Sequence, residues 1–163
     1  MRAALLSDIH DHETHLLLAL EAARAADCTH LLFMGDMAGL GTFRTLLDAW
    51  EHPIDLVFGN NEYQLGEFRK LAAASRHATL HGDTADIELS ARRLFLTHFP
   101  WAAQKAAESG LYDAVFYGHT HTAEIRRLGN TLIVNPGEIY GRQSKPGIGI
   151  YDTNSNTARL VHI

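Results

Sequence analysis

Residues 1–10 read MRAALLSDIH, an apolar stretch that runs directly into Asp8-Ile9-His10. Residues 2–7 have the length and composition of a buried β-strand. Strands of this kind belong to parallel sheets that are covered on both faces. Because ligands bind beyond the carboxyl ends of the strands in such sheets, Asp8 and His10 are candidate functional residues.

The pattern repeats along the chain. Apolar runs alternate with helical stretches over the first two thirds, which predicts parallel βαβ units, and the strand-rich end predicts a second sheet packed on the first. We predict strands at residues 2–7, 31–34, 54–58, 84–89, 92–97, 114–117, 123–128, 131–134, 147–151 and 158–163. A hairpin is expected at Gly129-Asn130.

Four helices are expected between these strands. Asp11 is expected to cap the first of them. The expected apolar faces are formed by Leu16, Leu17, Leu20 and Ala23 in the first helix and by Phe43, Leu46, Leu47 and Trp50 in the second. The other two are predicted at residues 63–74 and 101–109, and Gly110 is expected to end the last.

Length and composition favour one domain over residues 1–163, with 46% hydrophobic and 20% charged residues. Cys28 is the only cysteine, so no internal disulfide is possible, and it is expected to be an ordinary apolar residue. No signal peptide and no apolar run of about 20 residues is visible, so we expect a cytoplasmic protein without membrane contact.

The net charge is −5 and the cationic residues do not cluster, which disfavours binding of long nucleic acids. Small phosphate esters stay compatible with an acidic chain because bound cations dominate the local field.

Five predicted strands are each followed within a few residues by Asp, Asn or His side chains. The candidate residues are Asp8 and His10, Asp36, Asn60, His98, and His119 and His121. Within Asp8-Ile9-His10, and again within His119-Thr120-His121, side chains two apart would point the same way if the segment were extended. A single Asp-x-His is weak evidence, because turns and caps use the same residues. All five sites together favour a shared metal centre.

The chemistry fits phosphate ester hydrolysis. Two cations about 3.5–4 Å apart bind the phosphate oxygens and turn a bridging water into a nucleophile. Mixed imidazole, carboxylate and amide ligands suit Mn, Fe, Ni, Co or Zn. The remaining histidines are expected to be solvated, namely His15, His30, His52, His77, His81 and His162. His12 fits either a place near the site or a first-turn helix position.

The series Asp8-x-His10, Gly35-Asp36, Gly59-Asn60, His98 and Gly118-His119-x-His121 resembles the calcineurin-like metallophosphoesterase superfamily, in the family's order. Residues 135–138, Asn-Pro-Gly-Glu, resemble a further element of its small prokaryotic phosphodiesterase subfamily, and residues 109–113 are similar to archaeal members.

The resemblance implies a four-layer α/β/β/α sandwich of two packed mixed sheets flanked by helices. It also implies two divalent metals, with manganese the first expectation, and a hydroxide bridging them that attacks the phosphorus of a small phosphodiester. One metal would be held by Asp8, His10 and His121, and the other by Asn60, His98 and His119, with Asp36 bridging. Asn60 and His98 would also position the transition state.

Two positions depart from many relatives. Asn61 stands where many superfamily enzymes carry a histidine assigned to leaving-group protonation, and an amide is no general acid near neutral pH. This departure favours activated diesters. Phe99-Pro100 stands where relatives commonly have glycine, and we expect Phe99 to line the cleft and affect substrate choice.

Three alternatives stay open. A binding scaffold for protein partners, as in the retromer subunit that resembles these enzymes, is disfavoured because every expected ligand position of this chain carries a ligating residue type. A nuclease is disfavoured by the acidic charge, and a phosphomonoesterase is compatible with the sequence.

Members of the subfamily are often homo-oligomers. The loop with Arg142, Gln143 and Lys145 either touches a phosphate or is an exposed turn.

Overall fold

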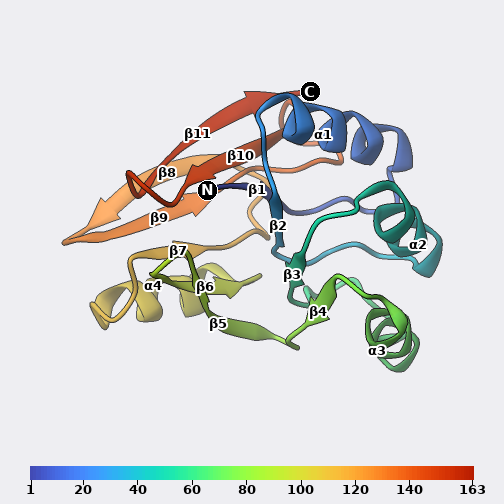
Figure 1. Ribbon diagram of the computed structural model, residues 1–163, viewed down its shortest axis with the longest axis horizontal. Coiled ribbons are helices and arrows are strands. Elements are labelled where there is room, and N and C mark those ends of the chain that lie inside the picture. Colours follow the sequence, from blue (N-terminus) through green and yellow to red (C-terminus); the bar gives the residue numbers. More distant parts are fainter.

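The chain forms two β-sheets stacked face to face, with helices on both outer sides, in a computed structural model that describes residues 1–163 (Figure 1). The first sheet has the order β11 (Thr157–His162), β10 (Gly147–Asp152), β1 (Arg2–Leu6), β2 (His30–Phe33), β3 (Ile54–Leu56) and β4 (Ala78–Leu80). The second has the order β5 (Thr84–Leu89), β6 (Arg92–Thr97), β7 (Ala114–Phe116), β9 (Thr131–Asn135) and β8 (Glu124–Leu128). The helices are α1 (Glu13–Ala25), α2 (Leu40–Ala49), α3 (Leu65–Ala74) and α4 (Pro100–Glu108).

Both sheets are mixed. Strands β1 to β4 run parallel, and β10 and β11 add antiparallel strands beside β1. In the second sheet β6, β7 and β9 run parallel between two antiparallel edge strands. The predicted four-layer α/β/β/α arrangement is therefore confirmed.

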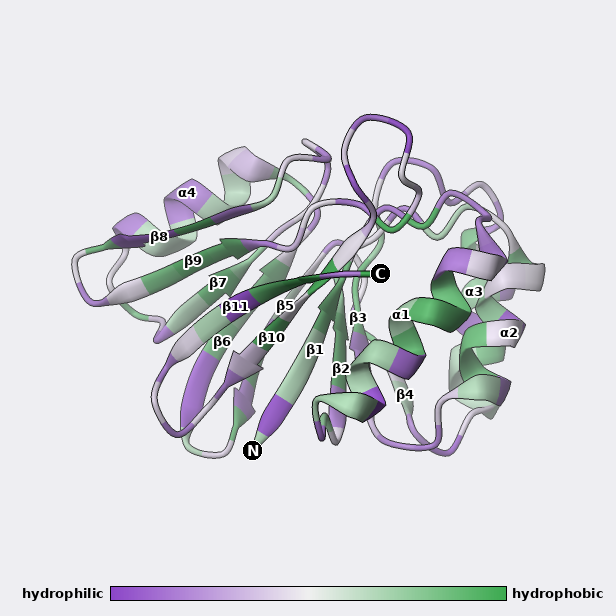
Figure 2. Cartoon of the chain, turned by 90° about the horizontal axis from the view of Figure 1, so that it is seen from above, coloured by the Kyte–Doolittle hydropathy of each residue, from purple (hydrophilic) through white to green (hydrophobic).

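Three apolar cores separate the four layers. Alternate residues of β1 point to opposite faces, so Ala4 and Leu6 join the core beneath α1, α2 and α3, whereas Ala3 and Leu5 join the core between the sheets. A smaller core with Val115 and Ile133 lies under α4. Figure 2 shows α4 on one side of the sheets and the other three helices on the opposite side. The parallel strands of both sheets are thus buried on two faces, as their apolar sequences predict.

The expected elements are present, with differences at particular residues. The short strand β4 was not predicted, because Ala78–Leu80 lies on a partly exposed sheet edge and has no long apolar run. Leu17 is 44% exposed and does not belong to the buried face of α1. Gly110 has a φ of +67°, as expected for a residue that ends a helix. No helix has the length and apolarity needed to cross a membrane.

The cap of the first helix was assigned to the wrong residue. His12 caps α1 by accepting a hydrogen bond from the backbone N–H of His15 (3.2 Å). Asp11 instead turns toward the start of α2, where its Oδ1 accepts bonds from the N–H of Gly39 and the hydroxyl of Thr42 (both 2.7 Å). Asp11 therefore joins the loops that follow β1 and β2 at the edge where the candidate site lies.

Two histidines expected in solvent are instead paired. His30 (8% exposed) donates from Nε2 to Asp55 Oδ2 (2.7 Å), and His81 Nε2 donates to Asp55 Oδ1 (2.6 Å). Burial raises the pKa of Asp55, but the hydrogen bonds from His30 and His81 outweigh it and lower this pKa to about 2. The trio fastens β4 to β2 through β3.

This trio makes the stability of the fold depend on pH. The folded pKa of Asp55 lies below its unfolded value near 4, so its contribution is full above about pH 4 and is lost as pH falls toward 2. We expect the free energy of unfolding of the wild type, relative to Asp55→Asn, to fall by about 2 kcal/mol across that window. Urea titrations from pH 5 downward measure it. Asp83→Asn, which removes an exposed carboxylate without an ion pair, should show no such trend.

Candidate metal centre

The predicted strand ends converge on one site at the seam between the two sheets. Asp8 and His10 follow β1, and Asp36 follows β2. Asn60 follows β3, His98 follows β6, and the pair His119 and His121 follows β7. The structure brings all seven predicted residues together, in three overlapping groups.

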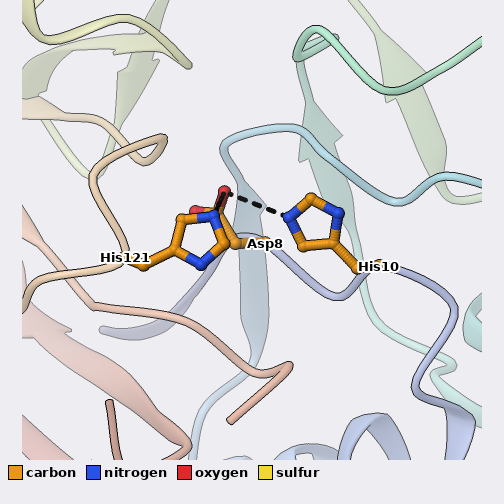
Figure 3. A group of neighbouring side chains, drawn as sticks. All are labelled: Asp8, His10 and His121. Carbon is orange, nitrogen blue, oxygen red and sulfur yellow. Dashed lines mark ion pairs between the residues drawn. The ribbon is translucent and has the colours of Figure 1, made fainter. Parts of the chain in front are cut away.

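The first group consists of Asp8, His10 and His121, shown in Figure 3. The Nε2 atoms of His121 and His10 lie 3.3 and 3.8 Å from Asp8 Oδ1. The other carboxylate oxygen of Asp8 accepts bonds from the Ser7 hydroxyl (2.5 Å) and the His119 N–H (3.1 Å). Asp8 Oδ1 and His10 Nε2, in contrast, are buried and have no hydrogen-bond partner. Two such orphaned atoms facing each other suit a shared cation.

The second group adds Asp36 and links the first group to the third. Asp36 Oδ2 lies 3.5 Å from His10 Nε2, and Asp36 Oδ1 lies 3.4 Å from His98 Nε2. Asp8, Asp36 and His98 together also form a buried cluster with metal-ligand spacing. The two oxygens of Asp36 therefore face opposite halves of the site.

The third group consists of Asn60, His98 and His119. Asn60 Oδ1 lies 3.1 Å from His98 Nε2 and 3.0 Å from His119 Nδ1, and the two ring nitrogens are 3.2 Å apart. Ligands about 2.1 Å from a tetrahedral metal are about 3.4 Å from one another. The spacing in all three groups is therefore close to that of a coordination shell.

The expected extended backbone at these motifs is wrong. Asp8, His10 and Asp36 have φ values of +55°, +47° and +62°, and His119 and His121 have +70° and +57°. Left-handed conformations cost non-glycine residues roughly 1–2 kcal/mol each. Strain of this kind is characteristic of functional sites, where the surrounding structure maintains it.

Glycines allow the loops to approach this closely. A Cβ at Gly59 would collide with the carboxylate of Asp36, and one at Gly118 would collide with the Ser7 hydroxyl and Asp8. The glycines of the Gly59-Asn60 and Gly118-His119 motifs therefore make room for the candidate ligands.

Both buried carboxylates stay ionised. Burial raises the pKa of Asp8, but the neighbouring imidazoles of His10 and His121 hold that pKa well below its ordinary value. Burial likewise raises the pKa of Asp36, and His98 lowers it more. The effect is mutual, because the nearby carboxylate of Asp8 raises the pKa of His121 to about 9. The site is thus a buried anionic centre that attracts positive charge.

Asn61 has a structural role. Its side-chain amide donates to Asp36 Oδ2 (2.6 Å), and the backbone N–H groups of Asn60 and Asn61 donate to Asp36 Oδ1 (2.8 and 3.0 Å). Asn61 therefore holds the carboxylate that faces both halves of the site.

The sequence did not assign roles to two acidic residues that support the site. Glu138 Oε2 lies 2.6 Å from His121 Nδ1, an arrangement that fixes which nitrogen of a metal-binding histidine faces the ion. Glu138 Oε1 accepts bonds from the N–H groups of Gln143 and Ser144, so the Arg142–Lys145 loop is fastened behind His121. The sequence pointed to Glu138 only through its place in the Asn-Pro-Gly-Glu element at residues 135–138.

The second supporting residue is Glu62, which is 8% exposed. Its carboxylate accepts bonds from the N–H of Met37 (2.6 Å) and the N–H of Gly59 (2.8 Å). It thereby ties the loop after β2 to the loop after β3, which carry Asp36 and Asn60.

Comparisons with known proteins agree with this geometry. A family model described as the calcineurin-like phosphoesterase superfamily domain matches residues 1–156. Phosphodiesterase MJ0936 of Methanocaldococcus jannaschii is 28% identical over 164 residues, covering 99% of this chain and 98% of the relative. A solved structure described as a novel archaeal phosphodiesterase matches with a TM-score of 0.92 and 28% identity over the full length of both chains.

Two more distant structures share the fold. YfcE, a phosphoesterase from E. coli, matches with a TM-score of 0.70 and 20% identity over the full length of both chains. The zinc complex of Vps29 from Entamoeba histolytica matches with a TM-score of 0.68 and 15% identity, covering all of this chain and 98% of Vps29.

The substitution Glu62→Gln tests the tie between the two loops. A glutamine offers one acceptor and one donor, so one backbone N–H would lose its buried partner, at about 1–3 kcal/mol. We expect urea unfolding of the metal-free protein to show a loss of that size. Glu67→Gln, on the exposed surface of α3, should change stability by no more than about 0.5 kcal/mol. Equal, small losses in both variants would contradict the role of Glu62.

Proposed function

The chain belongs to the calcineurin-like phosphoesterase superfamily, and on this premise we propose that it is a phosphodiesterase that acts with two divalent metal ions. One observation carries the proposal. Asp8 Oδ1 and His10 Nε2 are buried, unpartnered and directed at each other, in a site with two ionised carboxylates. A bound cation would give both atoms a partner and would offset the repulsion between the two carboxylates.

We assign Asp8, His10 and His121 to one metal and Asn60, His98 and His119 to the other, with Asp36 shared. The assignment follows the three groups of ligand atoms, which lie 3.0–3.8 Å apart. Imidazole, carboxylate and amide together suit manganese, our first expectation, and also Ni, Fe, Co or Zn.

Two bound divalent cations would supply charge for the phosphate oxygens and lower the pKa of a coordinated water. The chain itself holds the geometry for this chemistry. His98 donates from Nδ1 to the carbonyl of Met34 (2.7 Å), which leaves Nε2, beside Asn60 Oδ1, available to the proposed second metal and the phosphate it would bind. His98 and Asn60 therefore position the transferring group, and no side chain in the site serves as the nucleophile.

The substrate in this proposal is a small diester. The name of the relative MJ0936 and the description of the archaeal structure, both phosphodiesterases, support a diester. The net charge of −5 supports a small ester over a long nucleic acid. Because the amide of Asn61 is committed to Asp36, we propose that it does not protonate the leaving group, which favours esters with good leaving groups.

The scaffold alternative is less favoured. All seven ligand positions carry ligating residues, and their ligand atoms lie in three adjoining groups with the spacing described above. The cytoplasmic location and the homo-oligomer expected from the sequence stay predictions.

Asp36→Asn tests the shared ligand. An amide carries no negative charge and offers one oxygen, so both metals should be lost together. We expect metal analysis of the reconstituted protein to fall from two ions per chain to near zero. Asp55→Asn is the matched control, because Asp55 also binds two histidines but lies outside the site, and it should keep both ions. Two ions retained in Asp36→Asn would refute the bridging role.

A metal-restoration assay tests the activity. The stripped protein receives Mn, Ni, Zn or Mg, and hydrolysis of bis-p-nitrophenyl phosphate is compared with that of p-nitrophenyl phosphate. We expect metal-dependent cleavage of the diester, a weaker reaction with the monoester, and a loss of at least about 100-fold in His121→Ala. Absence of turnover with every metal, although metal is bound, would favour the scaffold instead.

A further inference from the structure

Two aromatic side chains extend outward from the third ligand group. Phe99 and Trp101 have ring centroids 6.2 Å apart and nearly parallel planes, 23° from each other. We call this pair the aromatic ledge. It occupies the positions directly after the ligand His98, at the start of α4.

The backbone fixes the inner half of the ledge. Phe99 is the N-cap of α4 in an extended conformation, and Pro100 starts the helix with a restricted φ. The Phe99 ring lies 5.2 Å from the ring of His98 and 5.5 Å from that of His119, measured between centroids. Phe99 therefore lines the catalytic site on the side of the proposed second metal.

The outer half is exposed at an apolar groove. Trp101 is 63% exposed, whereas the other tryptophan, Trp50, is 1% exposed. Next to it lies a groove of about 310 Å³ with Phe95, Ala102, Leu111 and Tyr112 in its wall. Phe99, beside the rings of His98 and His119, thus stacks on Trp101, which in turn borders this groove.

A cation stands beside the ledge. The ammonium of Lys105 lies 5.7 Å from the centre of the Trp101 ring and forms no salt bridge. Its four-carbon stem is flexible, so an entering ring can displace it while its charge stays near an anionic substrate.

Resting on the proposed phosphodiesterase function, we propose that the aromatic ledge binds the base of a nucleoside esterified to the reacting phosphate. The substrate class is therefore a small nucleotide diester. Aromatic side chains bind bases by stacking, without selecting a particular base. The ledge begins beside the proposed ligands of the second metal and ends at an exposed indole, which suits a flat ring attached to a phosphate bound at that metal. The acidic net charge favours such a small diester over a long nucleic acid.

Tryptophan fluorescence tests binding without turnover. Thymidine 5′-monophosphate is titrated into the metal-loaded protein, with ribose 5-phosphate as the ligand that lacks a base. We expect the nucleotide to quench the exposed indole of Trp101 and the sugar phosphate to leave it unchanged. Trp101→Phe should abolish the quenching, because only buried Trp50 then remains. Equal responses to both ligands would overturn the proposal.

A pair of esters tests the consequence for specificity. The p-nitrophenyl ester of thymidine 5′-monophosphate and methyl p-nitrophenyl phosphate share a leaving group and differ in the other alcohol. In the wild type we expect kcat/KM to favour the thymidine ester. Trp101→Ala should lower this preference about tenfold, chiefly through KM, and Trp101→Phe should restore most of it. Leu160→Ala, on the distant strand β11, should leave both esters unaffected.

The outcomes separate this inference from the proposed function. Hydrolysis of both esters with an unchanged preference in Trp101→Ala would overturn the ledge and leave the phosphodiesterase intact. If neither ester is hydrolysed, the proposed function fails, and the fluorescence titration still decides whether the ledge binds a base. An emission shift of Trp101 that depends on protein concentration without ligand would show a second copy of the chain on the ledge, which also overturns the proposal.

Discussion

The structure depends on two carboxylates, Asp8 and Asp36, held ionised and almost fully buried at the seam between the sheets. Removing one such charge from water costs several kcal/mol, and two neighbouring negative charges add repulsion. Hydroxyl, amide and backbone N–H groups donate hydrogen bonds to some of the carboxylate oxygens. Imidazole rings lie beside the others. The oxygen of Asp8 that receives no hydrogen bond shows where the protein alone leaves the charge uncompensated. This arrangement fits a metal-dependent member of the family.

The sequence predicted the layers and the seven candidate ligands because both follow from strand ends. An apolar run marks a buried strand, and parallel strands present the residues after them at one edge. The contacts across the chain were not accessible in the same way. Glu138 orients His121 from 17 residues away, and Asp11 binds the start of α2 and not the start of α1. His30 and His81 meet Asp55 only because β2, β3 and β4 are neighbours. Such pairs depend on which strands are adjacent, which local sequence does not encode.

The backbone of the candidate ligands is left-handed where an extended conformation was expected. Alternating side chains on an extended segment would suffice to place Asp8 beside His10. The structure uses left-handed residues instead, which turn each loop sharply at the strand end. This conformation is unfavourable locally and persists only where other contacts enforce it. Glu62, Glu138 and the glycines at positions 59 and 118 provide that enforcement. These contacts hold the ligand loops in place without any bound ligand, which reduces the entropy lost on binding.

The same reasoning separates an enzyme from a scaffold on this fold. A protein-binding platform needs the layers and an exposed face, but it gains nothing from buried carboxylates, strained ligand loops and a carboxylate that orients His121. Buried carboxylates and strained loops lower stability unless a cation or another contact offsets them. The aromatic ledge is a further feature of the same place. Its exposed indole, Trp101, lies near the third ligand group, next to Phe99, and not on a face remote from the site. The buried charges, the strained loops and the aromatic ledge all lie at one place. This combination fits a chain that acts on a bound phosphate ester.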